Sequence, residues 1–133
     1  MTLKTHLDAY CQAFNARSLD ATQSLFADHA LFELPLLGQR LFGRDEIAQG
    51  LKRIFALTEN AGFAFPTVAE SDRVLIGEGQ LQAKLHRDPA PVAMTAAITL
   101  EARDGKIARL STYLDARPYR LWTDGPIFAG AQQ

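Results

Sequence analysis

The period of the hydrophobic pattern changes near the middle of the chain, from that of helices to that of strands. In the first half, apolar residues recur every three or four positions, which is the spacing of one helix face. Leu3, Leu7, Tyr10 and Phe14 follow this spacing and predict a helix over residues 2–16. In the second half, apolar and polar residues alternate with a period of two, which is typical of strands.

Two more helices are predicted in the first half. Ser18 is a suitable N-cap for the second, which we expect to end at Asp28-His29. The third follows Gly43, with acidic residues in its first turn, and should stop between Asn60 and Gly62. Their expected buried stripes are Leu19, Thr22, Leu25 and Phe26 in the second helix, and Ile47, Leu51, Ile54 and Phe55 in the third.

Between the second and third helices the pattern predicts a strand, a tight polar turn and a short return strand. Ala30, Phe32 and Leu34 alternate with Leu31 and Glu33, and Pro35 closes the strand.

The second half predicts a series of strands. Residues 63–76 read as one or two short strands, interrupted by Pro66 and turning near Gly77 and Gly79. The alternation is clean over 80–86, and Asp88-Pro89-Ala90-Pro91 is predicted as a hairpin loop. Strands over 92–101 and 107–115 follow, joined by a turn at 103–106. Helices followed by adjacent strands indicate an α+β fold with an antiparallel sheet.

The predicted strand 92–101 has two unlike faces. One face is large and apolar, with Val92, Met94, Ala96, Ile98 and Leu100. The other is small and uncharged, with Ala93, Thr95, Ala97 and Thr99. A solvated face usually carries charges, so we expect either a partner subunit or the C-terminal segment to cover this one.

Composition and charge limit the class of protein and the partners to be expected. The chain has 133 residues and a formal charge of −1, so no basic excess indicates nucleic acid or an anionic membrane as a partner. We expect a single domain over 1–133. Cys11 is the one cysteine, which excludes an internal disulfide. No apolar run approaches the ~20 residues of a membrane span, and the first residues lack a signal-peptide core, so a cytoplasmic location is expected.

The sequence predicts neither a metal site nor a bound cofactor. His6, His29 and His86 lie on separate predicted elements, without the spacing of a metal site. Gly77-Glu78-Gly79 precedes a strand instead of a helix, so it does not match a phosphate-binding loop.

Residues 10–47 carry a family resemblance. Tyr10, Phe26-Ala27-Asp28, Glu33-Leu34-Pro35 and Gly43-Arg44 are similar to the corresponding pattern of ketosteroid isomerase. The chain thus resembles the nuclear transport factor 2-like superfamily, which also includes limonene epoxide hydrolase and the SnoaL polyketide cyclases. The resemblance implies an α+β cone of three helices on a curved mixed or antiparallel sheet, commonly a homodimer through the outer face of the sheet.

The same resemblance implies that the usual catalytic acids are missing. Leu34 stands at the position of the isomerase's general base, and Ala96 at that of its acidic oxyanion donor. Leu51 replaces a helix tyrosine, and Thr112 replaces the last acid of the hydrolases and cyclases. Tyr10 alone keeps a family catalytic group, the phenol that donates to the oxyanion.

The implied pocket is predominantly apolar. Tyr10 and Thr112 supply its two hydroxyl groups. Strand parity places Asp115 on the outer face unless a bulge turns it inward, and the aromatic tail could close the pocket mouth through Trp122. The candidate ligand-binding residues are Tyr10, Phe14, Phe32, Leu34, Leu51, Phe55, Met94, Ala96, Thr112, Leu114 and Trp122.

Three functions remain open at this point. The first is binding of a small hydrophobic or carbonyl-bearing molecule without acid/base catalysis. The second is an isomerase, cyclase or hydrolase with a rearranged site that uses Tyr10 and Asp115 as catalytic residues. The third is a non-catalytic, dimeric accessory module with a filled core.

Overall fold

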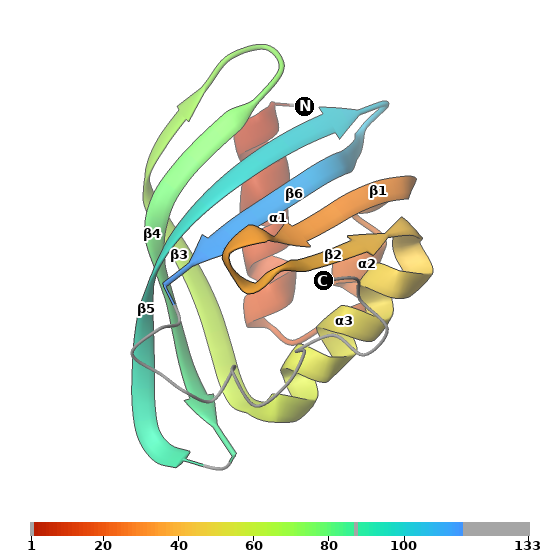
Figure 1. Cartoon of the computed structure of the whole chain (residues 1–133). Coiled ribbons are helices and arrows are strands. Elements are labelled where there is room, and N and C mark those ends of the chain that lie inside the picture. Colours follow the sequence, from red (N-terminus) through yellow and green to blue (C-terminus); the bar gives the residue numbers. More distant parts are fainter. Residues whose placement is uncertain (1, 87, 116–133) are drawn as a thin grey trace.

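The described residues form three helices that pack on the concave face of one curved, unclosed sheet (Figure 1). The structure is a computed structural model and describes residues 2–86 and 88–115. The helices are α1 (Leu3–Asn15), α2 (Leu19–Gln23) and α3 (Gly43–Leu57), and a 3-10 turn, η1, covers Pro35–Leu37. None of the described helices is long and apolar enough to cross a membrane. The α+β cone expected from the sequence is confirmed.

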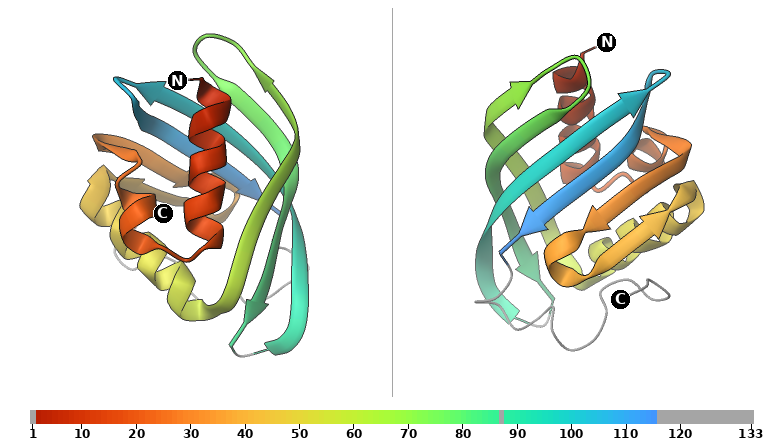
Figure 2. Two further views of the ribbon diagram at one scale, coloured as in Figure 1. Left: turned by 180° about the vertical axis from the view of Figure 1, so that it is seen from behind. Right: turned by 45° about the horizontal axis from the view of Figure 1, so that its top comes forward.

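The sheet has six strands in the order β2-β1-β6-β5-β4-β3. Their bounds are β1 (Phe26–Leu34), β2 (Gln39–Phe42), β3 (Thr58–Glu70), β4 (Leu75–Leu85), β5 (Asp88–Arg103) and β6 (Lys106–Leu114). All neighbours are antiparallel except β1 and β6, which pair in parallel and make the sheet mixed. Helix α1 packs mainly on β3, and α3 packs mainly on β1 (Figure 2).

Local sequence explains where the helices begin. The Thr2 hydroxyl accepts a hydrogen bond from the Thr5 backbone N–H at 3.1 Å and caps α1. Ser18 caps α2 in the same way, as predicted. At α3 the first-turn carboxylate of Glu46 accepts from the Phe42 N–H at 3.0 Å, which satisfies a backbone donor at the helix start.

Two predicted helix boundaries were wrong. Helix α2 ends at Gln23, and the segment from Phe26 to His29 already belongs to β1. Phe26 is fully buried, but as a strand residue that pairs with β6. The sequence could not show this, because a single apolar position fits a helix or a strand until its pairing partner is known. Helix α3 ends at Leu57, and β3 begins at once with Thr58, whose hydroxyl donates back to the Ile54 carbonyl.

The predicted turn near Gly77 and Gly79 was also wrong, because both residues lie inside β4. The chain reverses instead at residues 71–74, and β3 continues through Pro66 with a register shift between Ala64 and Thr67. A Cβ at Gly79 would overlap the Ala64 carbonyl oxygen, so the glycine permits the close approach of the irregular β3. The segment 88–91, predicted as a loop, is the start of β5.

The two faces of β5 are as predicted. Its apolar residues from Val92 to Leu100 are buried, and Ala93 and Thr95 on the other face are exposed. The turn to β6 is confirmed as a two-residue loop, in which Asp104 and Gly105 have φ angles of 54° and 77°. Positive φ at both positions is the geometry of a type I′ hairpin turn.

A side-chain amide joins the end of α1 to the sheet edge. Asn15 Oδ1 accepts from the Phe63 backbone N–H at 2.8 Å, and Asn15 Nδ2 donates to the Phe63 carbonyl at 3.1 Å. Strand β3 is an edge strand, so these two groups of Phe63 point away from β4. The amide of Asn15 therefore takes the place of a neighbouring strand at this position.

Candidate functional site

Apart from Asp115 and Trp122, the site residues expected from the sequence lie on the inner face of the sheet and on the helices that cover it. Strand β1 supplies Phe32 and Leu34, and the helices supply aromatic and aliphatic side chains opposite them. The members with an exposed fraction of 4% or less are Tyr10, Phe14, Phe32, Leu34, Leu51, Met94, Ala96, Thr112 and Leu114. Phe55 is half-buried at the margin of the same cluster, and Trp122 lies outside the described residues.

Tyr10 is surrounded by aromatic rings. Its ring centroid lies 5.9 Å from that of Phe14 and 6.2 Å from those of Phe26 and Phe63. Its exposed fraction is 1%, and burial, with a smaller contribution from Cys11, raises the pKa of the phenol far above its ordinary value. The phenol consequently stays protonated at physiological pH and can donate a hydrogen bond, but it does not act as a base.

Two buried polar atoms on the inner face have no hydrogen-bond partner among the described residues. The first is the Thr112 hydroxyl on β6, whose strand partner on β5 is the fully buried Ile98. The second is the side-chain amide oxygen, Oε1, of Gln39 on β2. Gln39 pairs with Leu34 of β1. The exposed fractions of Thr112 and Gln39 are 1% and 3%.

Sequence reasoning missed Gln39. A glutamine after a polar turn is typical of a surface position, and no periodicity marked it as buried. Its place becomes clear only from the pairing with Leu34, because antiparallel partners point to the same face of a sheet. The Gln39 amide nitrogen donates to the Leu37 carbonyl at 3.2 Å, which orients the amide and leaves its oxygen unpartnered.

Carboxylates are missing from the interior of the described part of the chain. The buried polar side chains there are His6, Thr22, Gln39, Thr58, Ser111 and Thr112. Acid/base chemistry at neutral pH usually needs a carboxylate or histidine within reach of the substrate. Tyr10 and Thr112 can hydrogen-bond, but neither supplies such a base.

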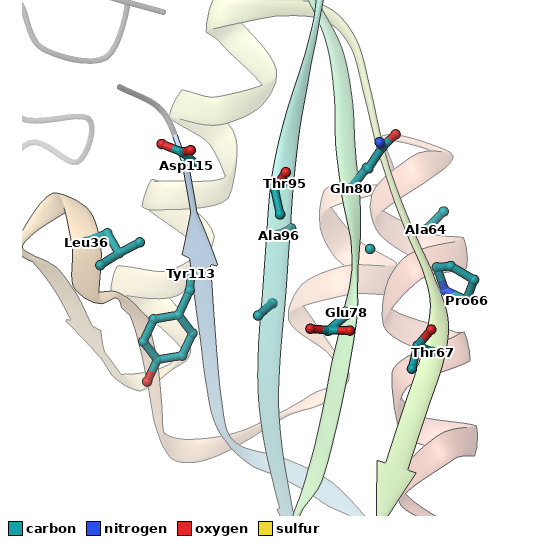
Figure 3. Close-up of a pocket in the computed structure, with 12 residues that line it drawn as sticks. Leu36, Ala64, Pro66, Thr67, Glu78, Gln80, Thr95, Ala96, Tyr113 and Asp115 are labelled. Carbon is teal, nitrogen blue, oxygen red and sulfur yellow. The ribbon is translucent and has the colours of Figure 1, made fainter. Parts of the chain in front are cut away.

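Asp115 belongs to the other side of the sheet. It lines a pocket of about 650 Å³ together with Glu78, Thr95, Ala97 and Tyr113. Figure 3 shows Asp115, Glu78, Thr95 and Tyr113 on the face turned away from the helices. Tyr10 lies in the core on the opposite face, so the structure does not bring Tyr10 and Asp115 together in one site. Strand parity explains the separation, because no bulge turns Asp115 inward.

Next to this pocket the outer face carries a cluster of charges. The carboxylate of Glu33 accepts from the Ser111 hydroxyl at 2.7 Å and lies 3.3 Å from Arg40 Nε and 3.5 Å from Arg109 Nε. Arg109 also donates to Glu101 at 2.6 Å, and this hydrogen bond raises the pKa of the guanidinium. Glu33 therefore lies on the outer face, in keeping with its alternation with the buried Phe32 and Leu34, and its partners there are Ser111 and two arginines.

Among the described residues, two further titratable groups with shifted pKa values, His6 and Cys11, lie in helix α1. Burial, together with the positive N-terminus, lowers the pKa of His6, which lines a separate pocket beside Glu70 and Asp104. Burial also raises the pKa of the Cys11 thiol to about 11, so the nucleophilic thiolate is scarce at neutral pH. Within the described ranges, no three histidine, cysteine or acidic side chains are placed to hold a metal ion.

One comparison with known proteins identifies the family. The family model of the SnoaL-like domain matches residues 7–110. No curated protein sequence matches the chain significantly.

Solved structures are similar in fold at low sequence identity. A candidate polyketide cyclase from Xanthomonas campestris has a TM-score of 0.80 and 20% identity, over 88% of this chain and 93% of that one. A protein of ketosteroid isomerase-like fold from Catenulispora acidiphila, in complex with trimethylamine, has a TM-score of 0.77 and 21% identity, over 85% and 86%. An LEH-like epoxide hydrolase from M. tuberculosis has a TM-score of 0.74 and 17% identity, over 85% and 82%.

Proposed function

Because the chain belongs to the SnoaL-like domain family, we propose that it uses the family's cone to bind a small hydrophobic or carbonyl-bearing molecule without acid/base catalysis. One observation carries the proposal: among the described residues, the inner face offers buried hydroxyl and amide groups, one of them the unpartnered Thr112 hydroxyl, and no carboxylate. A buried polar atom without a partner costs about 1–3 kcal/mol, and a bound ligand with a matching group removes this cost. Apolar walls with a few polar groups are typical of small-molecule sites.

Tyr10 is the residue that we expect to orient the ligand. Its phenol stays neutral because burial raises its pKa, so it can donate to a carbonyl oxygen over the whole physiological pH range. The aromatic rings around it would exclude water from that hydrogen bond. In this proposal Tyr10 binds the ligand and transfers no proton.

Replacing Tyr10 with phenylalanine should keep the fold and weaken the binding of carbonyl-bearing ligands. The substitution removes one neutral hydrogen bond, worth about 0.5–1.5 kcal/mol, which is roughly a 2- to 13-fold increase in Kd. Titration calorimetry of the wild type and Tyr10→Phe with a panel of small aromatic ketones and phenols measures the change.

Phe14→Leu is the matched control, because Phe14 shares the aromatic cluster with Tyr10 and has no polar group. It should affect ketones and their deoxygenated analogues equally. If no member of the panel binds the wild type at millimolar concentration, the ligand-binding proposal is wrong and the accessory-module function is favoured.

We also propose a homodimer through the outer face of the sheet. Ala93 and Thr95 are exposed, Ala97 is half-buried, and all three are small and uncharged. The neighbouring Leu36 has an exposed fraction of 65%, which adds apolar surface beside the pocket that Thr95 and Ala97 line. A partner subunit would remove this surface from water.

Thr95→Arg should dissociate the dimer, since it would place a long, charged side chain among the small residues at the centre of the interface. Sedimentation velocity at micromolar concentration should show a dimer for the wild type and a monomer for the variant. Gln49→Arg is the control, because it adds the same charge to an exposed position of α3. A monomeric wild type, or a dimer that Thr95→Arg leaves intact, would contradict the interface.

A further inference from the structure

We propose that a second pocket, at the end of the molecule where α1 begins, binds a small primary ammonium ion. This pocket, which we call the His6 pocket, has a volume of about 440 Å³. It is formed by the start of α1, the turn between β3 and β4 and the turn between β5 and β6. Figure 1 shows these three segments at the same end of the molecule. The pocket shares no residue with the candidate ligand-binding set or with the pocket of the outer face, so this inference goes beyond the proposed function.

The first step of the argument is the state of the His6 side chain. Its exposed fraction is 4%, and its imidazole makes no hydrogen bond to a described residue. The ring nitrogens are not among the fully enclosed unpartnered atoms of the described residues, so each keeps accessible surface, and the cavity that His6 lines is the His6 pocket. Most buried polar groups of native proteins are hydrogen-bonded. A ligand in the pocket would supply the partner that the imidazole lacks.

The second step is the kind of hydrogen bond that this ring can make. Burial and the positive N-terminus lower the pKa of His6, so the imidazole is neutral at pH 7. A neutral imidazole has one N–H donor and one acceptor nitrogen. The acceptor nitrogen requires an N–H or O–H group on the ligand, which a quaternary ammonium ion does not have.

The third step is the charge around the pocket. Glu70 and Asp72 line it from one turn, and Asp104 and Arg103 line it from the other. None of these four side chains forms an ion pair with another described residue. The N-terminus and the positive end of α1 oppose a cation here, but three carboxylates against Arg103 and the N-terminus leave the surroundings formally negative. The pocket therefore favours a cation over an anion.

The class of cation follows from the remaining walls. Within the described ranges, no three histidine, cysteine or acidic side chains are placed to hold a metal ion. An ammonium ion needs no fixed coordination geometry, and its N–H groups can reach the imidazole and the carboxylates together. Leu3 and the half-buried Ala102 add apolar surface for a short alkyl chain. A primary alkylammonium ion satisfies all of these groups.

NMR titration at low ionic strength with butylammonium, butyltrimethylammonium and 1-butanol tests the proposal. The quaternary ion keeps the charge without an N–H group, and the alcohol keeps a donor without the charge. The wild type should bind butylammonium about 10-fold more tightly than either analogue, the effect of one hydrogen bond from a charged donor. The backbone N–H signals of Leu3 and Gly105 should shift, and that of Gly62, which lines another pocket, should not.

Three variants separate the hydrogen bond from the charge. His6→Phe keeps a buried ring without nitrogens and should abolish the preference for butylammonium over the quaternary ion. Asp104→Asn should weaken both cations by a similar factor, and asparagine tolerates the φ angle of 54° at this position. Glu59→Gln is the matched control, because it removes a carboxylate from the same strand as Glu70 but outside the pocket. It should leave both affinities unchanged.

A second measurement uses the wild type alone, so it does not depend on the folding of a variant. Protonation removes the acceptor of the imidazole and makes the ring repel a cation. Butylammonium should therefore bind above the folded-state pKa of His6 and be released as the pH falls through it. By linkage, the bound cation should lower the pKa of His6 further. Proton NMR of the imidazole with and without butylammonium measures this shift.

Equal affinities for butylammonium and the quaternary ion would overturn the proposal, since charge attraction alone would then account for the binding. A His6 pKa that saturating butylammonium leaves unchanged would overturn it as well. If the signals of Leu3 and Gly105 do not shift, water alone occupies the pocket and the proposal is wrong. None of these outcomes affects the binding function of the inner face, which rests on other residues and other ligands.

Discussion

Leu34→Asp should destabilise the protein by about 3–5 kcal/mol at neutral pH. The exposed fraction of Leu34 is 4%, so the variant loses most of the burial energy of a leucine and places a carboxylate in an apolar environment. Burial should raise the pKa of the new carboxyl above the roughly 3.9 of the unfolded chain. The destabilisation should therefore be smallest below about pH 4 and increase as the pH rises through the folded-state pKa. Urea unfolding at several pH values measures it.

Leu36→Asp is the matched control. Leu36 lies two residues further along, in the 3-10 turn, with an exposed fraction of 65%. In the dissociated subunit, for which both Leu→Asp substitutions are made in the Thr95→Arg background, Leu36→Asp should cost no more than about 0.5 kcal/mol, with little dependence on pH. If Leu34→Asp unfolds at the same urea concentration as the wild type, position 34 faces water, and the inner-face site is wrong.

Gly79→Ala should cost about 1–3 kcal/mol, an unusually large loss for the addition of one methyl group. A Cβ at this position would overlap the Ala64 carbonyl oxygen and lie 2.8 Å from the Phe65 Cα. Both are backbone atoms of β3, so the strand itself must move, and no side-chain rotation relieves the contact. Thermal unfolding should show the loss, and Gln80 and Thr95 beside the outer pocket should shift in NMR spectra.

Gly77→Ala in the same strand is the comparison. Its new Cβ would lie 3.2 Å from Ile98 Cγ2, a side-chain methyl that can yield by a few tenths of an ångström. This variant should therefore be clearly more stable than Gly79→Ala. Equal losses for the two variants would mean that β3 does not approach Gly79 as closely as described.

The elements that were predicted well are those with one buried face, which the spacing of apolar residues reveals directly. In β5, buried and more exposed residues alternate over its whole predicted length. The spacing of Leu3, Leu7, Tyr10 and Phe14 fits only a helix for α1. The failures occurred where a residue's role depends on another strand. Phe26 fits a helix stripe by spacing, but its pairing with Ile107 makes it a strand residue. Gly79 resembles a turn glycine until the approach of β3 is known.

Some residues of the candidate site could likewise be predicted from the sequence, and others could not. Tyr10, Leu34 and Thr112 could be named from the sequence, because the family resemblance assigns positions to them. Gln39 could not, since neither its burial nor its free oxygen follows from local pattern. Both depend on the register with Leu34 and on the carbonyl of Leu37, which are properties of the folded chain.

The amide of Asn15 has a consequence for the behaviour of the protein in concentrated solution. An edge strand with free N–H and C=O groups is a template for strands of other molecules and promotes fibril growth. Because Asn15 occupies both groups of Phe63, an incoming strand cannot continue its ladder of hydrogen bonds past this point. We therefore expect Asn15→Ala, which frees both backbone groups of Phe63, to make the β3 edge more prone to pairing with strands of other molecules.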